Sequence, residues 1–255
     1  MKVSEIFLSL QGEGIFSGYP AVFIRLGGCN LNCSFCDTTE VMNKWKEKTP
    51  KQVITYLKYR GWYKKMIQDH VRVVFTGGEP MLQLREINEL ITLIEADSTK
   101  YEQKNNNNVS GFCPTNMETN GTIFTKDFSD LKIGHTVISP KLSNSGIKKA
   151  LRYKRKNLKQ FLNAMRLDDY SFKFVVSHKK DIDEIEKDFI KPFKLAPDQI
   201  WLMAMTPPKP EFFGNTFNGI TLRTDYRFGA IEIAKACLEH SFNYSPRLHI
   251  DLDIK

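Results

Sequence analysis

Short apolar runs alternate with longer segments of helical periodicity along most of the chain. Runs that are apolar almost throughout are typical of parallel strands covered on both faces. Such runs lie at 21–26, 72–75, 115–118, 135–138, 171–176 and 199–204, and a last strand is expected near 244–250. Helices are predicted at 50–60, 84–96, 181–189 and 225–240. The first begins with Thr49-Pro50, the pattern of an N-cap followed by proline, and Ile231, Ala234 and Cys237 mark the expected buried face of the last.

The alternation of strand and helix implies parallel pairing with right-handed crossovers. Six core strands predict an α/β fold, a partial, open β/α barrel, because 255 residues leave little room for eight units. One domain over residues 1–255 is expected. The asparagine run at 105–108 is predicted as a loop tip between a helix and a strand.

Composition narrows the class of protein. Hydrophobic residues make up 41% of the chain, which indicates a globular protein and excludes global disorder. Residues 1–10 lack the long apolar run of a signal peptide, and no stretch reaches the roughly 20 apolar residues that cross a bilayer. We therefore expect a cytoplasmic protein with no membrane partner.

The formal net charge of +8 is concentrated in one segment. No acidic residue occurs from Lys141 to Leu167, and that stretch contains Lys148, Lys149, Arg152, Lys154, Arg155, Lys156, Lys159 and Arg166. Two interpretations stay open: a face that binds anions or nucleic acid, and a solvated helix and loop. The second is favoured, since only Tyr153 and Phe161 are interleaved with the charges as possible stacking platforms.

Three of the five cysteines fall within eight residues. Cys29, Cys33 and Cys36 have the spacing C-x3-C-x2-C and follow the first predicted strand and a Gly-Gly turn. Three thiolates on one loop can hold three corners of a four-iron, four-sulfur cluster and leave the fourth iron open to a chelating ligand. The methionine end of S-adenosylmethionine suits that position, and electron transfer to its sulfonium would produce a carbon radical. The alternative is a structural zinc site completed by Cys113; otherwise Cys113 and Cys237 are predicted to be small buried residues.

A second motif, Thr76-Gly77-Gly78-Glu79-Pro80, directly follows the next strand. Its glycines allow the backbone to approach a ligand closely. The carboxylate of Glu79 could take the amino group of methionine or brace the loop. Together, the cysteine loop and this turn resemble the radical S-adenosylmethionine superfamily, which implies the [4Fe-4S] cluster and S-adenosylmethionine as cofactors and an external one-electron reductant of the flavodoxin or ferredoxin type.

A narrower resemblance rests on several motifs in order. These are 10–14 (LQGEG), 18–26 (GYPAVFIRL), 36–38 (CDT), 118–122 (ETNGT) and 139–141 (SPK). Together they look like the 7-carboxy-7-deazaguanine synthase family. The resemblance implies a lyase that converts 6-carboxy-5,6,7,8-tetrahydropterin to 7-carboxy-7-deazaguanine with loss of ammonia, assisted by Mg²⁺. It also implies a homodimer and a product that feeds queuosine-type nucleosides.

The resemblance assigns site residues by position. Those implied to bind S-adenosylmethionine are Phe35, Cys36, Asp37, Gly77, Gly78, Glu79, Ser139, Pro140 and Lys141; those implied to bind substrate are Leu10, Gln11, Gly12, Glu13, Arg25 and Thr76, with Glu118 and His249 as further candidates. The guanidinium of Arg25 could hold the substrate carboxylate by two-point contact. Thr38 matches the magnesium ligand, and a neutral hard oxygen suits an ion that keeps most of its waters.

The chain departs from the family pattern at several places. Phe35 replaces a tryptophan, Ile250 stands where a lysine usually follows the histidine, and 201–206 matches only loosely. The basic stretch is longer than expected and is interpreted as an insertion or lid at about 142–168. Two other functions remain as alternatives: an activase that makes glycyl radicals on a partner protein, and an iron–sulfur or zinc module that binds nucleic acid. If the chain is a synthase of this family, no nucleic-acid partner is expected.

Overall fold

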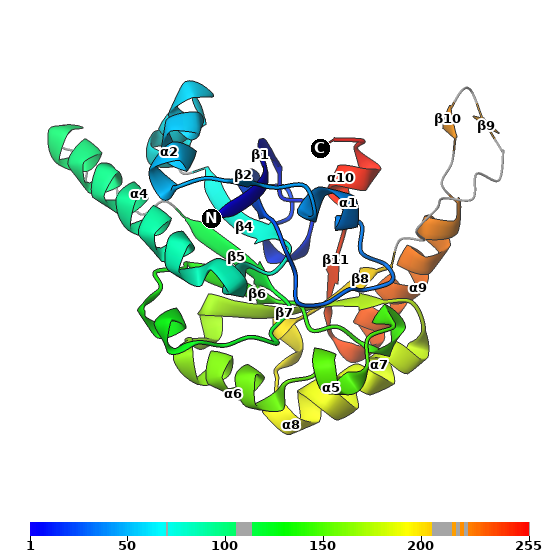
Figure 1. Ribbon diagram of the computed structural model, residues 1–255. Helices are drawn as coiled ribbons and strands as arrows, with labels where there is room; N and C mark the ends of the chain where they lie inside the picture. The colour runs from blue at the N-terminus through cyan, green and yellow to red at the C-terminus, as the bar shows by residue number, and fades with distance from the viewer. Residues whose placement is uncertain (70, 106–113, 206–215, 218–219, 222–223, 255) are drawn as a thin grey trace.

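A single curved sheet with helices on its outer face forms the body of the molecule (Figure 1). The computed structural model describes residues 1–69, 71–105, 114–205, 216–217, 220–221 and 224–254. Neighbouring strands lie in the order β11-β8-β7-β6-β5-β4-β2-β1-β3. The parallel strands are β2 (Pro20–Leu26), β4 (Arg72–Gly77), β5 (Thr115–Thr119), β6 (His135–Ile138), β7 (Tyr170–Val176), β8 (Ile200–Ala204) and β11 (Asn243–Ser245). The predicted open β/α barrel is confirmed, with β11 as an additional parallel strand.

Two antiparallel strands extend one edge of the sheet. β1 (Lys2–Leu10) pairs with β2, and β3 (Lys46–Glu47) pairs with the beginning of β1. β9 (Thr216–Phe217) and β10 (Ile220–Thr221) form a separate two-stranded sheet. β1 was not predicted from the sequence; it mixes polar and apolar residues, whereas the parallel strands are apolar almost throughout.

Most of the helices lie between successive strands and cover the outer face of the sheet, and one helix follows the last strand (Figure 1). They are α1 (Thr39–Met42), α2 (Pro50–Tyr59), α3 (Trp62–Gln68), α4 (Leu84–Asn105), α5 (Lys149–Arg152), α6 (Arg155–Ala164), α7 (Lys179–Ile185), α8 (Lys191–Phe193), α9 (Thr224–His240) and α10 (Leu248–Asp251). Thr49 caps α2 as predicted: its side chain accepts a hydrogen bond from the Gln52 amide, and the Gln52 side chain accepts one from the Thr49 amide. In the part of the chain described by the structure, no helix has both the length and the apolar character needed to cross a membrane.

The two faces of the sheet differ in chemistry because side chains alternate along each strand. On β7, Phe172 and Phe174 are fully buried in the hydrophobic core beneath the helices. Lys173 between them is also buried, on the other face. The inner face of the barrel therefore carries polar groups in a position shielded from bulk water.

Two details of the predicted C-terminal region are wrong. The strand expected near 244–250 ends at Ser245, and α10 follows; Pro246 has no amide hydrogen to continue a strand ladder. On α9 the buried face contains Ile233 and Cys237, whereas Ile231 is 51% exposed. Residues 106–108 of the predicted loop tip and Cys113 lie outside the described residues.

The basic segment at about 142–168 forms the crossover between β6 and β7. It contains α5 and α6, and α6 buries Leu158 and Phe161. The Phe161 ring packs edge-on against Phe124 and Phe128, at centroid distances of 5.0 and 4.8 Å. The segment is thus anchored in the core by its apolar side chains, while most of its cations face solvent.

Candidate active site

The cysteine loop and the glycine turn meet at the carboxyl ends of β2 and β4. The Glu79 amide donates to the Gly28 carbonyl at 2.8 Å, and the Gly78 amide donates to the Leu26 carbonyl at 2.8 Å. A Cβ atom added at Gly78 would lie 1.6 Å from the Gly28 carbonyl oxygen. Glycine is therefore required at position 78 for the close approach of two backbones.

Glu79 holds this turn against the end of β5. Its carboxylate is fully buried and accepts hydrogen bonds from the Thr119 hydroxyl at 2.7 Å, the Asn120 amide at 2.8 Å and the Met81 amide at 2.9 Å. Burial raises the pKa of Glu79, and these donors act in the opposite direction. Of the two roles considered for Glu79, the geometry corresponds to bracing the loop.

An amide network ties the cysteine loop to the turn after β5. The Asn120 side-chain amide donates to Asn30 Oδ1 at 2.9 Å and lies 4.0 Å from the Cys29 sulfur. The Asn30 side-chain amide donates to the Thr122 hydroxyl at 2.8 Å. From the ETNGT motif at 118–122 only Glu118 was predicted as a site residue, so this fixation of the loop was not predicted.

The three cysteines of the loop carry free thiols. Cys29, Cys33 and Cys36 are all free and partly exposed. Burial raises the pKa of the Cys29 and Cys33 thiols, and the nearby Lys141 ammonium lowers it. Each of the three thiolates can bind one iron of a four-iron cluster. Cys113, the fourth ligand of the alternative zinc site, lies outside the described residues.

Other residues implied to bind S-adenosylmethionine or Mg²⁺ surround this loop. Thr38 Oγ1 lies 3.5 Å from the Cys36 sulfur, and Thr38 is the residue before α1. The Lys141 ammonium donates to the Ser139 hydroxyl at 3.2 Å, and the Ser139 amide donates to the Thr119 carbonyl at 2.7 Å. Segment 139–141 therefore follows β6 directly beside the end of β5.

A polar network of buried and half-buried side chains lies on the inner face of the barrel. Glu118 accepts hydrogen bonds from Gln11 Nε2 at 3.2 Å and from the Thr76 hydroxyl at 2.8 Å. The Lys173 ammonium lies 3.9 Å from Glu118 and donates to Glu13 at 2.5 Å. The structure thus brings together four residues that the sequence analysis selected from separate motifs, around a lysine that it did not select.

The charges of this network are interdependent. Burial alone would raise the pKa of Glu13, but Lys173 and Arg247 outweigh burial and lower that pKa to about 2. Burial alone would lower the pKa of Lys173, but Glu118 and Glu13 raise it above its usual range. Both carboxylate and ammonium are therefore kept ionised in a buried position.

The C-terminal segment closes over the N-terminal motif. The Leu248 amide donates to the Gly12 carbonyl at 3.0 Å. Arg247 pairs with Glu13, at 3.4 Å, and with Asp37 of the cysteine loop. The His249 ring lies 3.9 Å from Glu13, and burial lowers the pKa of His249 while Glu13 raises it. His249 was predicted as a site residue, whereas Arg247 was missed although it is two positions away.

Arg25 lies beside Thr76 in the register between β2 and β4. Its guanidinium pairs with Glu5 on β1 at 3.3 Å and lies 5.6 Å from the centroid of the Phe7 ring. Leu10, at the end of β1, leads into the Gln11–Gly14 turn of the network. Arg25 is thus held on the inner face by a partner that the sequence analysis did not identify.

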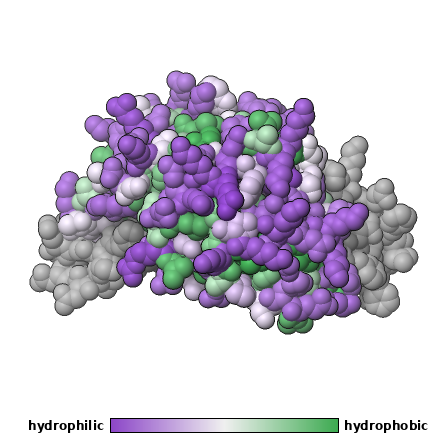
Figure 2. All heavy atoms as spheres, turned by 90° about the horizontal axis from the view of Figure 1, so that it is seen from below, coloured by the Kyte–Doolittle hydropathy of each residue, from purple (hydrophilic) through white to green (hydrophobic). Residues whose placement is uncertain are grey.

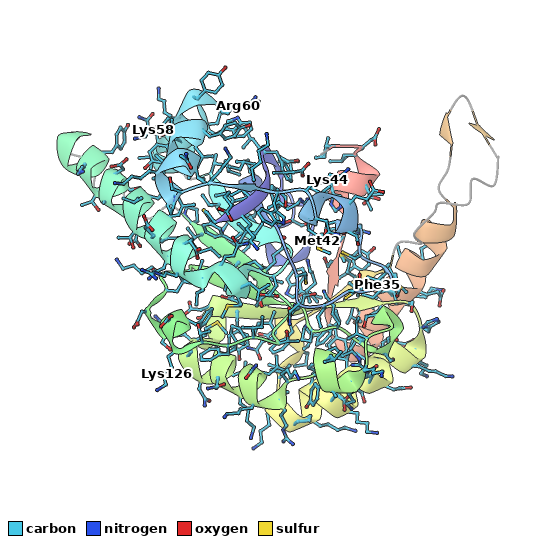
Figure 3. The ribbon with its side chains drawn as sticks, in the orientation of Figure 1. Phe35, Met42, Lys44, Lys58, Arg60 and Lys126 are labelled. Carbon is cyan, nitrogen blue, oxygen red and sulfur yellow. The ribbon has the colours of Figure 1, made fainter. Side chains whose placement is uncertain are left out.

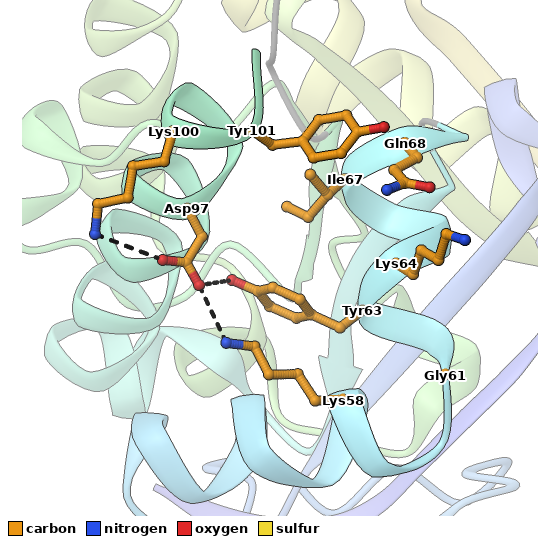
Figure 4. A pocket seen from close by; sticks show the side chains of 9 residues that line it. All are labelled: Lys58, Gly61, Tyr63, Lys64, Ile67, Gln68, Asp97, Lys100 and Tyr101. Atoms are coloured by element: carbon orange, nitrogen blue, oxygen red, sulfur yellow. Dashed lines mark hydrogen bonds and ion pairs between the residues drawn. The ribbon is translucent and has the colours of Figure 1, made fainter. Parts of the chain in front are cut away.

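A cavity of about 430 Å³ lies elsewhere, between α3 and α4 (Figure 4). Within it, Asp97 accepts a hydrogen bond from the Tyr63 hydroxyl at 2.9 Å and pairs with Lys58 at 3.3 Å. None of the predicted site residues lines this cavity. The chemistry-bearing groups gather instead at the carboxyl ends and inner face of the strands, where barrel sites form.

Comparisons with known proteins agree with this arrangement. Residues 23–178 match the family model described as the radical SAM superfamily. The 7-carboxy-7-deazaguanine synthase of Clostridium acetobutylicum is 36% identical over 76% of this chain and 76% of its own length, and that of Pyrobaculum aerophilum is 32% identical over 98% and 93%. The fold resembles the crystal structure of QueE from Escherichia coli, with a TM-score of 0.63, 21% identity and coverage of 96% of this chain and 92% of that one. The chain belongs to the 7-carboxy-7-deazaguanine synthase family of the radical SAM superfamily.

Proposed function

We propose that this lyase converts 6-carboxy-5,6,7,8-tetrahydropterin to 7-carboxy-7-deazaguanine with release of ammonia. The observation that carries the proposal is the polar network of Gln11, Thr76, Glu118, Lys173 and Glu13 beside the cysteine loop. Membership of the family places the enzyme in 7-deazaguanine biosynthesis. The donors and acceptors of the network could form hydrogen bonds with a polar, ring-shaped substrate.

Residues next to this network would hold the two cofactors. When bound, the [4Fe-4S] cluster and S-adenosylmethionine supply a carbon-centred radical. Cys29, Cys33 and Cys36 would hold the cluster, and the turns at 77–79 and 139–141 would hold S-adenosylmethionine together with 35–37. Glu79 ties the 77–79 turn to Thr119 and Asn120, and Asn120 ties that segment to Asn30 of the cysteine loop. These bonds hold the turn and the loop in fixed relative positions.

The network complements the edge of a pterin ring. Such an edge carries N–H donors beside a carbonyl acceptor, and a carboxylate held ionised accepts from two donors at once. We assign this acceptor role to Glu118, with Gln11 Nε2 as the neighbouring donor. Lys173 and Arg247 keep the pKa of Glu13 low, so that Glu13 is an acceptor at neutral pH. Arg25 is assigned to the substrate carboxylate.

Thr38 is the proposed protein ligand of Mg²⁺, with substrate oxygens and waters as the remaining ligands. Its hydroxyl lies 3.5 Å from the Cys36 sulfur. Changing Thr38 to Ala should weaken the stimulation of turnover by Mg²⁺, measured by titrating the ion into an assay of product formation. Thr39→Ala is the matched control; equal stimulation of wild type and T38A would exclude this role.

From the family resemblance we also propose a homodimer in the cytoplasm. Light scattering coupled to gel filtration of the reconstituted protein tests the dimer; a single species of the monomer mass at micromolar concentration would contradict it.

Anaerobic reconstitution with iron and sulfide tests the reaction. The reconstituted protein is assayed with S-adenosylmethionine, dithionite, Mg²⁺ and the carboxypterin, and the deazaguanine product is followed by mass spectrometry. Glu118→Gln should reduce kcat/KM by at least ~10-fold while S-adenosylmethionine is still cleaved without substrate, because a loss of about 1.5–3 kcal/mol is typical of a charged hydrogen bond. Absence of product from wild type with a full cluster would refute the proposal.

A further inference from the structure

The crossover between β6 and β7 presents a cationic surface that the proposed reaction does not use. We call it the basic face: Lys148, Lys149, Lys154, Arg155, Lys156 and Lys159. It lies on the underside of the molecule, over α5 and α6, where hydrophilic side chains cover most of the surface (Figure 2).

Most charges of the basic face lack a carboxylate partner in the part of the chain that the structure describes. Lys149 pairs with Asp188 at 2.5 Å. The buried Arg152 beneath the face pairs with Glu184 at 2.6 Å. Among the described residues, no ion pair is formed by Lys148, Lys154, Arg155, Lys156 or Lys159. The face therefore carries a net positive field that attracts an acidic surface.

The crossover that carries the basic face contacts the cysteine loop at one place and the turn after β5 at another. The Ser34 amide, between Cys33 and Cys36, donates to the Ser145 carbonyl at 3.0 Å, four residues before Lys149. On the other side, the Asn157 side-chain amide donates to the Thr122 carbonyl at 2.6 Å, and the Thr122 hydroxyl accepts from Asn30, the neighbour of Cys29. A protein seated on this face would lie beside the loop that holds the cluster (Figure 1).

An apolar side chain stands within the cationic surface. Leu151 on α5 is 55% exposed and lies in the sequence between Lys149 and Lys154. An apolar contact surrounded by charges is the composition of a transient protein–protein interface, in which charge sets the rate of encounter.

The aromatic side chains of this segment do not suit single-stranded nucleic acid. The Tyr153 ring packs edge-on against Phe189 at 5.4 Å, and its hydroxyl donates to the Asp188 carbonyl at 2.9 Å. Phe161 is fully buried. Neither ring is available as a platform on which a base could stack.

We infer that the basic face is the docking surface of a small acidic one-electron carrier protein. The inference rests on the proposed function, since the radical reaction needs an external reductant. The bound carrier is oxidised by one electron, the cluster is reduced by one electron, and no atom or proton is transferred between the proteins. The carrier is recognised by charge complementarity around Leu151 and by its access to the loop at Ser34.

The test compares two triple variants of the reconstituted enzyme. In K148E/R155E/K156E, three exposed cations of the basic face become anions. In the control K51E/K64E/K65E, the same change is made on exposed lysines of α2 and α3. Figure 3 shows these regions apart: Phe35 of the cysteine loop lies on the side of α5, and Lys58 and Arg60 mark α2 at the opposite end.

Two readouts do not depend on the pterin. The first is the Kd of oxidised flavodoxin, used as the acidic carrier, measured by surface plasmon resonance at low salt. The second is the rate of cluster reduction by flavodoxin hydroquinone or by dithionite, followed by the appearance of the reduced cluster in electron paramagnetic resonance. We expect K148E/R155E/K156E to lose at least ~10-fold in both flavodoxin measurements, to keep its dithionite rate within about twofold of wild type, and to lose its difference from wild type at high salt.

Three results would overturn the inference: an unchanged flavodoxin rate in K148E/R155E/K156E, an equal loss in the control, or an RNA affinity that the triple variant abolishes while flavodoxin binding persists. Failure of the proposed function is a separate result, because it appears as normal cluster reduction with no deazaguanine product from either reductant.

Discussion

Lys173 has an unusual position for a lysine, because it is buried within a strand whose two neighbours are phenylalanines of the core. Its ammonium is compensated by Glu13 at 2.5 Å and Glu118 at 3.9 Å. Buried ion pairs contribute little net stability as a unit, but removal of one partner leaves an uncompensated charge. The network is therefore sensitive to the loss of any single member.

Replacement of Lys173 by Met should lower the free energy of unfolding by about 3–5 kcal/mol, because Glu118 then loses its neighbouring cation and Glu13 keeps only its longer pairing with Arg247. Urea denaturation measures this. Lys179→Met, at an exposed position, is the control and should stay within ±0.5 kcal/mol. The double variant E13Q/K173M should lose less than the sum of its single variants; strict additivity would show that the two side chains are not coupled.

The low pKa of Glu13 predicts a pH dependence of stability. A carboxyl whose pKa is about 2 when folded and 4.5 in its ordinary state stabilises the fold fully above about pH 4.5. That contribution is lost as the pH falls from about 4.5 toward 2. In Glu13→Gln, the free energy of unfolding should fall less steeply across this window than in wild type, as followed by urea denaturation at successive pH values. Glu89→Gln, on the exposed side of α4, should keep the wild-type slope; equal slopes in all three proteins would contradict the prediction.

At the scale of residues, the sequence predicted the site residues that stand in motifs but not the cations that pair with them. Gln11, Glu13, Thr76 and Glu118 stand in recognisable motifs and meet as expected. Lys173 had one available signal, a charged residue inside an otherwise apolar strand. Arg247 had none, since its partners Glu13 and Asp37 are brought to it only by the tertiary fold.

At the scale of elements, the cofactor site is built from three turns, which follow β2, β4 and β5. Each is short, and each is bonded to the next: Glu79 to Gly28, and Thr119 and Asn120 to Glu79. Parallel strands place such turns at one edge of the sheet, so their proximity could be predicted from the strand pattern. The bonds between them could not, because backbone contacts leave little trace in side-chain identity.

Gly78→Ala should disturb this junction. The added Cβ has no room beside the Gly28 carbonyl, so the backbone must shift, at a cost of about 1–3 kcal/mol. We expect less iron and sulfide per chain after reconstitution, together with a lower urea midpoint. Gly229→Ala on α9, where an added Cβ meets nothing within 4 Å, is the control. Full cluster content in G78A would show that the turn and the cysteine loop do not depend on this contact.

Over the whole molecule, the site joins the two ends of the described chain. β1 and the turn after it supply Gln11 and Glu13, and α10 with its preceding residue supplies Arg247 and His249. The intervening parallel strands were predictable from their apolar runs, whereas the antiparallel β1 and the helical α10 were not, since neither follows the β/α alternation. The site therefore depends on β1 and α10, the two elements that the sequence pattern did not predict.

Truncation after Pro246 should impair the substrate network and leave the cysteine loop intact. Cluster content and substrate-free cleavage of S-adenosylmethionine should persist, because the three cysteines and their bracing residues remain. Product formation should fall by more than ~10-fold, since Glu13 loses a buried charged partner. Arg247→Ala should reproduce most of this loss, and truncation after Leu252 should not. A truncated enzyme with wild-type kcat/KM would show that α10 has no part in the site.

The ion pair between Asp37 and Arg247 spans 210 residues, and this separation has a consequence for synthesis on the ribosome. The cysteines are translated within the first sixth of the chain, long before Arg247 exists. A nascent chain therefore exposes its three thiols to iron, oxygen and other thiols for most of its elongation, since domains complete their folding only when distant segments become available. A chain that ends before Arg247 would keep its three cysteines but would lack the ion pairs that join the C-terminal segment to Glu13 and Asp37.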